Sequence, residues 1–400
     1  MAEPKPDRNR DRRRPEKNRP RGSQSPDAPR RSASEPLPLR DPALRLKVGI
    51  TMGDPHGIGP ELLVQTFSDP RWTDLLLPVV YGSGRVLQHY KQQLKAEKFG
   101  FANLTDASQP HGKRLNLVEV ADYTDRIEPG TASPAAGKLG FQALERACAD
   151  LSAGHLDALV TLPIDKQTIQ SEEFRFPGHT EYLGAQFGRP NPLMLMVWEE
   201  LRVAVATGHI PLGQVPSALK ADNLGSQLQL LHNTLRIDFG LTKPRLAVLG
   251  LNPHAGDGGL LGSEDRELIL PVVESLREKG LLVYGPYAAD GFFASDQRHR
   301  FDGVLAMYHD QGLIPFKALS NGWGVNYTAG LPIIRTSPDH GTAYDIAGKG
   351  RADATSFRNA LYYALDIYRM RQQNEDLLRT ALRKPSVIDQ LAAEEGLLEE

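Results

Sequence analysis

The 400-residue chain has one cysteine, Cys148, and no long apolar run. A single cysteine excludes a disulfide framework and any zinc site built from cysteines alone. A membrane-spanning helix needs roughly 18 consecutive apolar residues, and no stretch of the sequence approaches that length. The first residues also lack the apolar segment of a secretory signal. We therefore expect a soluble, cytoplasmic protein.

The formal charge of −2 conceals two segments of opposite charge. Residues 1–45 hold 13 Lys and Arg against 7 Asp and Glu, with nine prolines and almost no large apolar side chains. The remaining 355 residues hold 34 basic and 42 acidic side chains. A segment with so little to bury is typical of disorder. This basic tail could contact nucleic acid through Arg12–Arg14, but a solvated extension without a partner is the simpler interpretation, and the acidic body argues against a nucleic-acid partner.

From Leu46 onward, short β-branched runs alternate with amphipathic stretches. The pattern predicts strands at 47–51, 76–82, 115–120, 158–162, 193–198, 201–207, 245–251, 281–284, 304–308 and 333–336. The clearest helical stretches are 134–151, 215–239, 263–279 and 352–371. Alternating strands and helices indicate an α/β fold with a mostly parallel sheet. Since no Gly/Ser linker divides the body, any two domains are expected to be interleaved.

Three histidines, His209, His254 and His309, follow the ends of predicted strands. Open α/β sheets bind ligands at the carboxyl ends of their strands, so the three imidazoles could converge there on zinc or a similar divalent ion. Asp310 and Asp290 are candidates for an outer ligand or for a carboxylate that orients an imidazole. The alternative is that these are ordinary loop histidines, because spacings of 45 and 55 residues match no compact metal motif.

A fourth histidine, His179, precedes Thr180 at the start of a short helical stretch. Side-chain donors beside the free N–H groups of a helix N-terminus suit an anionic substrate group. The alternative is a helix cap, with Thr180 capping and Glu181 favouring the helix dipole. The two roles can coexist.

Two glycine-rich stretches, 51–61 and 339–350, flank these segments. The first lacks the lysine of a P-loop and the spacing of the dinucleotide fingerprint, so by itself it indicates only a tight strand-to-helix turn. The second is a candidate nucleotide loop, since its glycines let a ligand approach the backbone. Between the two, Lys317 and Arg335 could clamp a phosphate or carboxylate, and Asn326 lies between them in sequence.

Six stretches of the body together resemble the 4-hydroxythreonine-4-phosphate dehydrogenase family of pyridoxal phosphate biosynthesis. They are TMGDPHGIGPE (51–61), FPGHTEYL (176–183), ATGHIPL (206–212), GLNPHAGDGG (250–259), MYHDQGLIPFK (307–317) and GLPIIRTSPDHGTAYDIAGKG (330–350). The resemblance implies the fold of isocitrate and isopropylmalate dehydrogenases, with two interleaved α/β/α domains and a cleft between them. The first domain would comprise 46–175 with 320–400, and the second, 176–319, would carry the metal-binding histidines.

The resemblance also implies the reaction and the site. The family oxidises 4-phosphooxy-L-threonine at C3 with NAD or NADP, and the product decarboxylates to 3-amino-2-oxopropyl phosphate. It is a homodimer with shared active sites, each holding one divalent metal (zinc, magnesium or cobalt) on three histidines drawn from both subunits. The corresponding residues here are the metal ligands His209, His254 and His309, the substrate contacts His179, Thr180, Lys317, Asn326 and Arg335, and the cofactor contacts His340, Thr342 and Asp345.

Two positions depart from the family's usual pattern. Gly208 stands where a threonine is common, and Asp257 stands where a glutamate is common. Neither change removes an expected ligand. The motifs do not separate this activity from that of a paralogous dehydrogenase of 4-phospho-D-threonate or 4-phospho-D-erythronate. An acyltransferase on a related fold is a further alternative, which the strand-end histidines and the candidate nucleotide loop disfavour.

Overall fold

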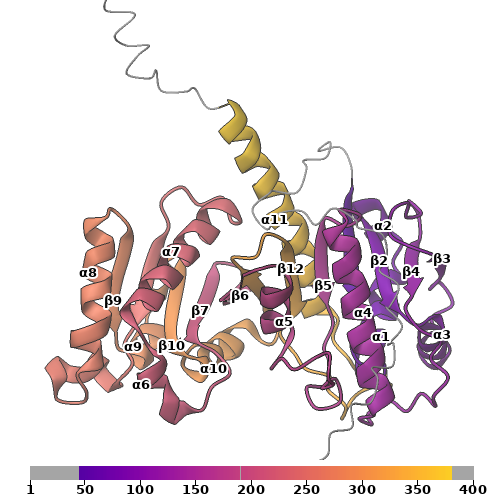
Figure 1. Ribbon diagram of the computed structural model, residues 1–400, viewed down its shortest axis with the longest axis horizontal. Coiled ribbons are helices and arrows are strands. Elements are labelled where there is room, and N and C mark those ends of the chain that lie inside the picture. Colours follow the sequence, from indigo (N-terminus) through magenta and orange to yellow (C-terminus); the bar gives the residue numbers. More distant parts are fainter. Residues whose placement is uncertain (1–44, 190, 381–400) are drawn as a thin grey trace, which may run out of the picture. The chain divides into compact units, whose positions relative to one another are not determined.

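The computed structural model describes residues 45–189 and 191–380 (Figure 1). The predicted basic tail, apart from Arg45, and the last twenty residues of the first predicted domain lie outside the described residues. Every helix in the described ranges is too short or too polar to cross a membrane.

Twelve strands in these ranges form one sheet, in the order β3-β4-β2-β1-β5-β12-β11-β6-β7-β10-β8-β9 (Figure 1). The strands are β1 (Leu46–Thr51), β2 (Leu76–Gly82), β3 (Phe101–Leu104), β4 (Leu115–Glu119), β5 (Ala158–Thr161), β6 (Leu193–Trp198), β7 (Leu201–Thr207), β8 (Arg245–Leu249), β9 (Leu282–Tyr287), β10 (Gly303–Tyr308), β11 (Val325–Ala329) and β12 (Ile334–Pro338). Only the pairs β6–β7, β6–β11 and β11–β12 are antiparallel among the described pairs. The prediction of an α/β fold with a mostly parallel sheet is confirmed.

Helices cover both faces of this sheet. They are α1 (Gly59–Phe67), α2 (Arg71–Leu75), α3 (Gly84–Gln93), α4 (Pro134–Ser152), α5 (His179–Gln186), α6 (Val215–Ala218), α7 (Ala221–Ile237), α8 (Leu270–Glu278), α9 (Ala289–Ala294), α10 (His309–Ser320) and α11 (Thr355–Thr380). Side chains alternate between the faces along each strand, as the pleat requires. In β2, for example, Val80 belongs to the buried cluster that includes residues of α1, α3 and α11, whereas Val79 and Tyr81 belong to a separate cluster with residues of α4 and α5.

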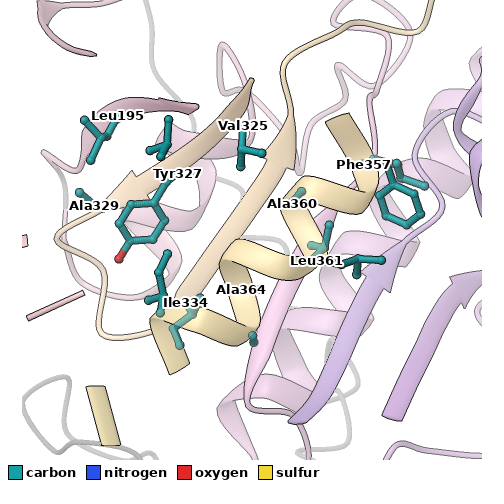
Figure 2. Close-up of a cluster of buried hydrophobic side chains, with 14 of the residues drawn as sticks. Leu195, Val325, Tyr327, Ala329, Ile334, Phe357, Ala360, Leu361 and Ala364 are labelled. Carbon is teal, nitrogen blue, oxygen red and sulfur yellow. The ribbon is translucent and has the colours of Figure 1, made fainter. Parts of the chain in front are cut away.

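The long helix α11 shows how this packing positions the strands at the middle of the sheet. Figure 2 shows Leu361 and Ala364 of α11 in one buried cluster with Val325 and Tyr327 of β11 and with Ile334 at the start of β12. Burying one large apolar side chain stabilises the fold by roughly 2 kcal/mol. The cluster therefore holds β11 and β12 firmly beneath the site described below.

The predicted strands and the clearest predicted helices agree with the structure except in four places. Each of the ten predicted strands overlaps an observed strand, but β3 and β11 were not predicted. The predicted helix 215–239 is wrong as one helix, because Leu219 and Lys220 are extended and separate α6 from α7. This break lets Leu219 reach the core, where it is buried. The predicted helix 263–279 begins with a π-helical turn over Asp265–Ile269. The α-helix α8 follows it and has a proline in its first turn.

The sheet order bears on the predicted division into two domains. The strands of the first predicted domain form one end of the sheet, in the order β3-β4-β2-β1-β5-β12-β11. The strands of the second form the other end, in the order β6-β7-β10-β8-β9. Both sets belong to one continuous sheet. The division at 46–175 with 320–400 and at 176–319 stays a prediction.

Candidate functional site

A cavity of about 200 Å³ is lined by residues of four consecutive strands of the sheet, β5, β12, β11 and β6. Its wall combines Thr161 of β5, Asn326 of β11 and Arg335 of β12 with two histidines, His209 shortly after β7 and His309 directly after β10. The first turn of α5 completes it. The carboxyl ends of parallel strands are where α/β sheets bind ligands, so the cavity stands at the place the sequence indicated.

Arg335 is the buried cation of this cavity. Its side chain is 2% exposed and donates hydrogen bonds to Thr161 Oγ1, at 2.6 Å from Nη2, and to Thr328 Oγ1, at 2.9 Å from Nη1. Burial lowers the pKa of its guanidinium to about 10. In the described part of the chain no carboxylate forms an ion pair with it. Because an unpaired buried charge is costly, this guanidinium is suited to receive an anion.

His179 and Thr180 begin α5 and both line the cavity. Burial, followed by the positive charges of Arg335 and Lys166, keeps the pKa of His179 well below its ordinary value, so the imidazole is neutral. Lys166 lines the same cavity. The capping interpretation of Thr180 is wrong, because the helix starts after Gly178 and no side chain caps it.

Five buried polar atoms on the cavity wall have no hydrogen-bond partner among the residues that the structure describes. They are His179 Nε2, Glu181 Oε2, Asn326 Oδ1, Asp339 Oδ2 and His340 Nε2. Buried polar groups in folded proteins are almost always paired, and each exception calls for a reason. A polar ligand that fills the cavity would supply the missing partners.

Lys317 lies beside the cavity and is held by Asp339. Its Nζ is 3.0 Å from Asp339 Oδ1 and donates to the Asp339 carbonyl at 3.0 Å. Burial raises the pKa of Asp339, although the Lys317 ammonium opposes this. An ammonium has three donors, and two of them go to Asp339. One donor is left for a ligand.

His209 and His309 lie together on the cavity wall, with ring centroids 5.5 Å apart. The Nδ1 of His209 is 3.3 Å from Glu181 Oε1, and the Nδ1 of His309 is 2.7 Å from Asp310 Oδ1. A carboxylate at Nδ1 fixes the ring and leaves Nε2 to bind a metal. Although burial opposes ionisation, the hydrogen bond with His209 keeps the pKa of Glu181 below its ordinary value.

The structure does not bring His254 to this pair within one chain. His254 is exposed, in a turn where His254, Ala255 and Asp257 all have positive φ. Asp265 holds this turn, because its Oδ1 accepts from Leu251 N at 2.7 Å. Within residues 45–189 and 191–380, no group of three or more His, Cys, Asp or Glu side chains is placed to hold a metal ion. One chain therefore offers two of the three predicted ligands at one point.

Asp290 lies apart from these residues. It is exposed in the first turn of α9 and does not line the cavity. Asp310, by contrast, contacts His309 as described above. Glu181 and Asp339 were not among the predicted site residues. Their only signal in the sequence is that each adjoins a predicted residue, Thr180 or His340.

The two glycine-rich stretches pack against each other. Ile58 N donates to the carbonyl oxygen of Thr342 at 3.0 Å, and the Tyr344 hydroxyl donates to Asp54 Oδ2 at 2.7 Å. Of the predicted cofactor contacts, His340 lines the cavity, Thr342 touches the first stretch, and Asp345 is exposed. Burial lowers the pKa of His340. The predicted nucleotide loop thus runs from the cavity to the surface.

Comparison with known proteins agrees with the resemblance seen in the motifs. Residues 74–364 match the family described as Pyridoxal phosphate biosynthetic protein PdxA. The chain is 48% identical over 341 residues to 4-hydroxythreonine-4-phosphate dehydrogenase of Bacteroides thetaiotaomicron, covering 85% of this chain and 93% of that protein.

Solved structures give the same result. The crystal structure of 4-hydroxythreonine-4-phosphate dehydrogenase from Klebsiella pneumoniae aligns with a TM-score of 0.70 at 34% identity, over 82% of this chain and 99% of that one. The corresponding structure from Burkholderia phymatum aligns with a TM-score of 0.67 at 36% identity, over 80% and 98%. The chain belongs to the family of pyridoxal phosphate biosynthetic protein PdxA.

Proposed function

We propose that this protein oxidises 4-phosphooxy-L-threonine at C3 with NAD or NADP. The product, 2-amino-3-oxo-4-phosphooxybutanoate, would then lose CO₂ to give 3-amino-2-oxopropyl phosphate. The observation that carries the proposal is the cavity in which Arg335, buried without a carboxylate partner, faces polar atoms that lack partners. The names of its relatives support the same reaction.

The substrate's anionic groups find suitable residues in and beside this cavity. The Arg335 guanidinium can donate two parallel hydrogen bonds to one phosphate or carboxylate. Neutral His179, Thr180 and Asn326 can add further hydrogen bonds, and Lys317 can direct its remaining donor to the same ligand. Arg335 and Lys317 also carry the positive charge that an anion requires.

His209 and His309 would hold a divalent metal (zinc, magnesium or cobalt) through Nε2. The chemistry of these donors fits, because each Nδ1 faces a carboxylate and each Nε2 is left for the ion. When bound, such an ion supplies Lewis acidity that lowers the pKa of the C3 hydroxyl. Glu181 and Asp310 would keep the two rings oriented. His254 of the partner subunit would be the third ligand.

Exposed apolar side chains support a homodimer with shared sites. Leu212 is 68% exposed three residues after His209, and Leu260 is 79% exposed six residues after His254. Ile314, five residues after His309 on α10, is 67% exposed. All three histidine segments therefore carry an apolar side chain that water surrounds in a single chain. A two-fold interface would bury these side chains and bring His254 to the partner's histidine pair.

The cofactor would lie along the loop of His340, Thr342 and Asp345. A nicotinamide bound there would supply the hydride acceptor for C3, and these residues would align it. His340 has a buried Nε2 without a partner at the cavity, so it is suited to contact the cofactor at the reacting end.

The test is nicotinamide reduction by purified protein, followed by absorbance, with NAD or NADP and with or without a chelator. Chelator-sensitive turnover of 4-phosphooxy-L-threonine alone is the expected result. Turnover of only 4-phospho-D-threonate or 4-phospho-D-erythronate would assign the protein to the paralogous activity. Turnover of none of the three would refute the proposed reaction.

A further inference from the structure

Glu61, the last residue of the first glycine-rich stretch, is bound to the second one. Its side chain is 0% exposed. Oε1 accepts from Ala352 N at 2.9 Å, and Oε2 accepts from Gly348 N at 3.1 Å. Gln65, one turn further along α1, donates to Oε1 at 3.2 Å. Both oxygens of a buried carboxylate thus receive backbone N–H groups, which makes the hydrogen bonds charge-assisted.

Two further links join the stretches on the side nearer the cavity. Asp54 accepts from the Tyr344 hydroxyl at 2.7 Å and, through its other oxygen, from His56 N at 2.8 Å. Ile58 N binds the carbonyl of Thr342. Glycine suits this approach at Gly57, because a Cβ there would lie 3.0 Å from the Thr342 carbonyl oxygen and the loop would have to move slightly away. The first stretch therefore binds the loop through hydrogen bonds at four residues, Thr342, Tyr344, Gly348 and Ala352.

The backbone of the loop requires such support. Ala343 has a φ of 45°, a conformation that residues with a Cβ rarely adopt. It lies between Thr342 and Tyr344, which are both bound to the first stretch. Backbone strain of this kind persists where the surrounding structure holds it, and it is concentrated at ligand sites.

We propose that Glu61 is a positioning residue for the nicotinamide dinucleotide. It does not touch the cofactor, but it holds the loop in the shape that presents His340, Thr342 and Asp345. This inference rests on the proposed function, which assigns the dinucleotide to that loop. It also assigns the stretch 51–61 a role in cofactor binding, beyond that of a tight turn between a strand and a helix.

The test uses Glu61→Gln in the full chain, with binding of NAD and of NADP and steady-state kinetics. An amide keeps the size of the side chain but has one acceptor oxygen, and its NH₂ group would face a backbone N–H. We expect the Kd and KM of the dinucleotide to rise about tenfold, as for the loss of one charge-assisted hydrogen bond. The KM of the phosphorylated substrate and the kcat at saturating dinucleotide should be unchanged, whereas a merely structural defect would alter all of them.

Three variants complete the test. Tyr344→Phe removes a single hydroxyl from the loop side, where it binds Asp54, and should raise the dinucleotide Kd by a smaller factor. Glu61→Asp keeps the charge but is one methylene shorter, so it should also raise the dinucleotide Kd, and it decides the question if Glu61→Gln does not fold. Glu119→Gln is the matched control, because Glu119 also accepts a backbone N–H, from Gly84 at 2.8 Å, but at the start of α3. It should bind the dinucleotide as the wild type does.

The outcomes separate this inference from the proposed function. If the wild type binds the dinucleotide and folded Glu61→Gln binds it equally well, the positioning role alone is overturned. If Glu61→Gln does not fold, unchanged binding by Glu61→Asp has the same meaning. A parallel rise of the KM of the substrate would overturn it too. Failure of the wild-type protein to bind either dinucleotide would overturn both.

Discussion

At the scale of single residues, Arg335 shows how the cavity is prepared for an anion. Its guanidinium is buried, and the threonine hydroxyls of Thr161 and Thr328 satisfy part of its hydrogen-bonding capacity without neutralising its charge. A buried charge without a counter-ion weakens the fold, and a bound anion removes that cost. The residue therefore contributes to binding at the expense of stability.

Arg335→Met removes the charge and keeps most of the side-chain length. We expect kcat/KM for the phosphorylated substrate to fall at least about 100-fold, because a charged hydrogen-bonding partner of the substrate is lost. The free energy of unfolding should stay the same or rise, since an unpaired buried charge is removed. Kinetics and urea unfolding measure the two effects. Arg335→Lys should be intermediate in activity, and an unchanged kcat/KM in Arg335→Met would contradict the role of this residue.

The lowered pKa of His179 should make the folded protein less stable as the pH falls. Its pKa in the folded protein lies below the ordinary value of 6.5, so below pH 6.5 the unfolded chain binds a proton that the folded one does not. The stabilisation is complete above that pH and is lost as the pH falls. Relative to His179→Gln, the wild type should lose up to about 1.4 kcal/mol of unfolding free energy per pH unit. Urea unfolding between pH 7 and pH 5 tests this, and parallel curves for the two proteins would refute it.

At the scale of elements, a buried ion pair fixes α11 to the strands that carry the site. Arg371 of α11 donates to Asp238 Oδ1 at 2.7 Å, and the Tyr327 hydroxyl of β11 donates to Asp238 Oδ2 at 2.6 Å. Arg371 also reaches the carbonyls of Leu331 and Pro332 in the β11–β12 connection. The group thus supports the hairpin from which Asn326 and Arg335 reach the cavity.

Arg371→Met should lower the free energy of unfolding by roughly 3 kcal/mol, because Asp238 is left buried without a cation. Combining it with Asp238→Asn should cost less than the sum of the two single changes, since residues in one network are not independent. Denaturant unfolding of the three variants measures this coupling. Additive losses would show that the pair does not act as a unit.

At the scale of the whole molecule, one chain contains an incomplete version of the proposed metal site. Two histidines meet at the cavity, whereas the third lies in an exposed turn, next to exposed apolar side chains. A two-fold dimer would complete two sites at once. Mixed dimers can therefore test whether the ligands come from one chain or from two.

His209→Ala and His254→Ala should each abolish turnover when prepared alone. If the subunits share ligands, a mixed dimer of the two variants has one site with both histidines intact. Unfolding and refolding the variants together should then restore about a quarter of wild-type activity, because half of the dimers are mixed and each has one of two sites intact. No recovery, with mixed dimers demonstrated by mass, would mean that both ligands come from the same chain.

Local sequence patterns predicted most of the elements of this fold. Alternation of apolar residues has a period of two in strands, so ten strands could be placed from neighbouring residues alone. The short edge strand β3 is only partly buried and gives a weak pattern. The strand β11 carries the polar Asn326 and Thr328 on one face, because that face adjoins the cavity and Arg335. These polar side chains interrupt the apolar pattern by which a buried strand is recognised, so β11 was not predicted.

The sequence by itself determined the α/β class, the family and the residue types at the site, because these are properties of short segments. Tertiary structure alone decided which distant segments meet. It placed His209 beside His309 but not His254, paired Lys317 with Asp339, and packed Glu61 against the loop at Gly348. Such contacts depend on strand order and on the close approach of backbones, which no local pattern encodes. For this reason the role of the first glycine-rich stretch became apparent only when the loop it supports was in place.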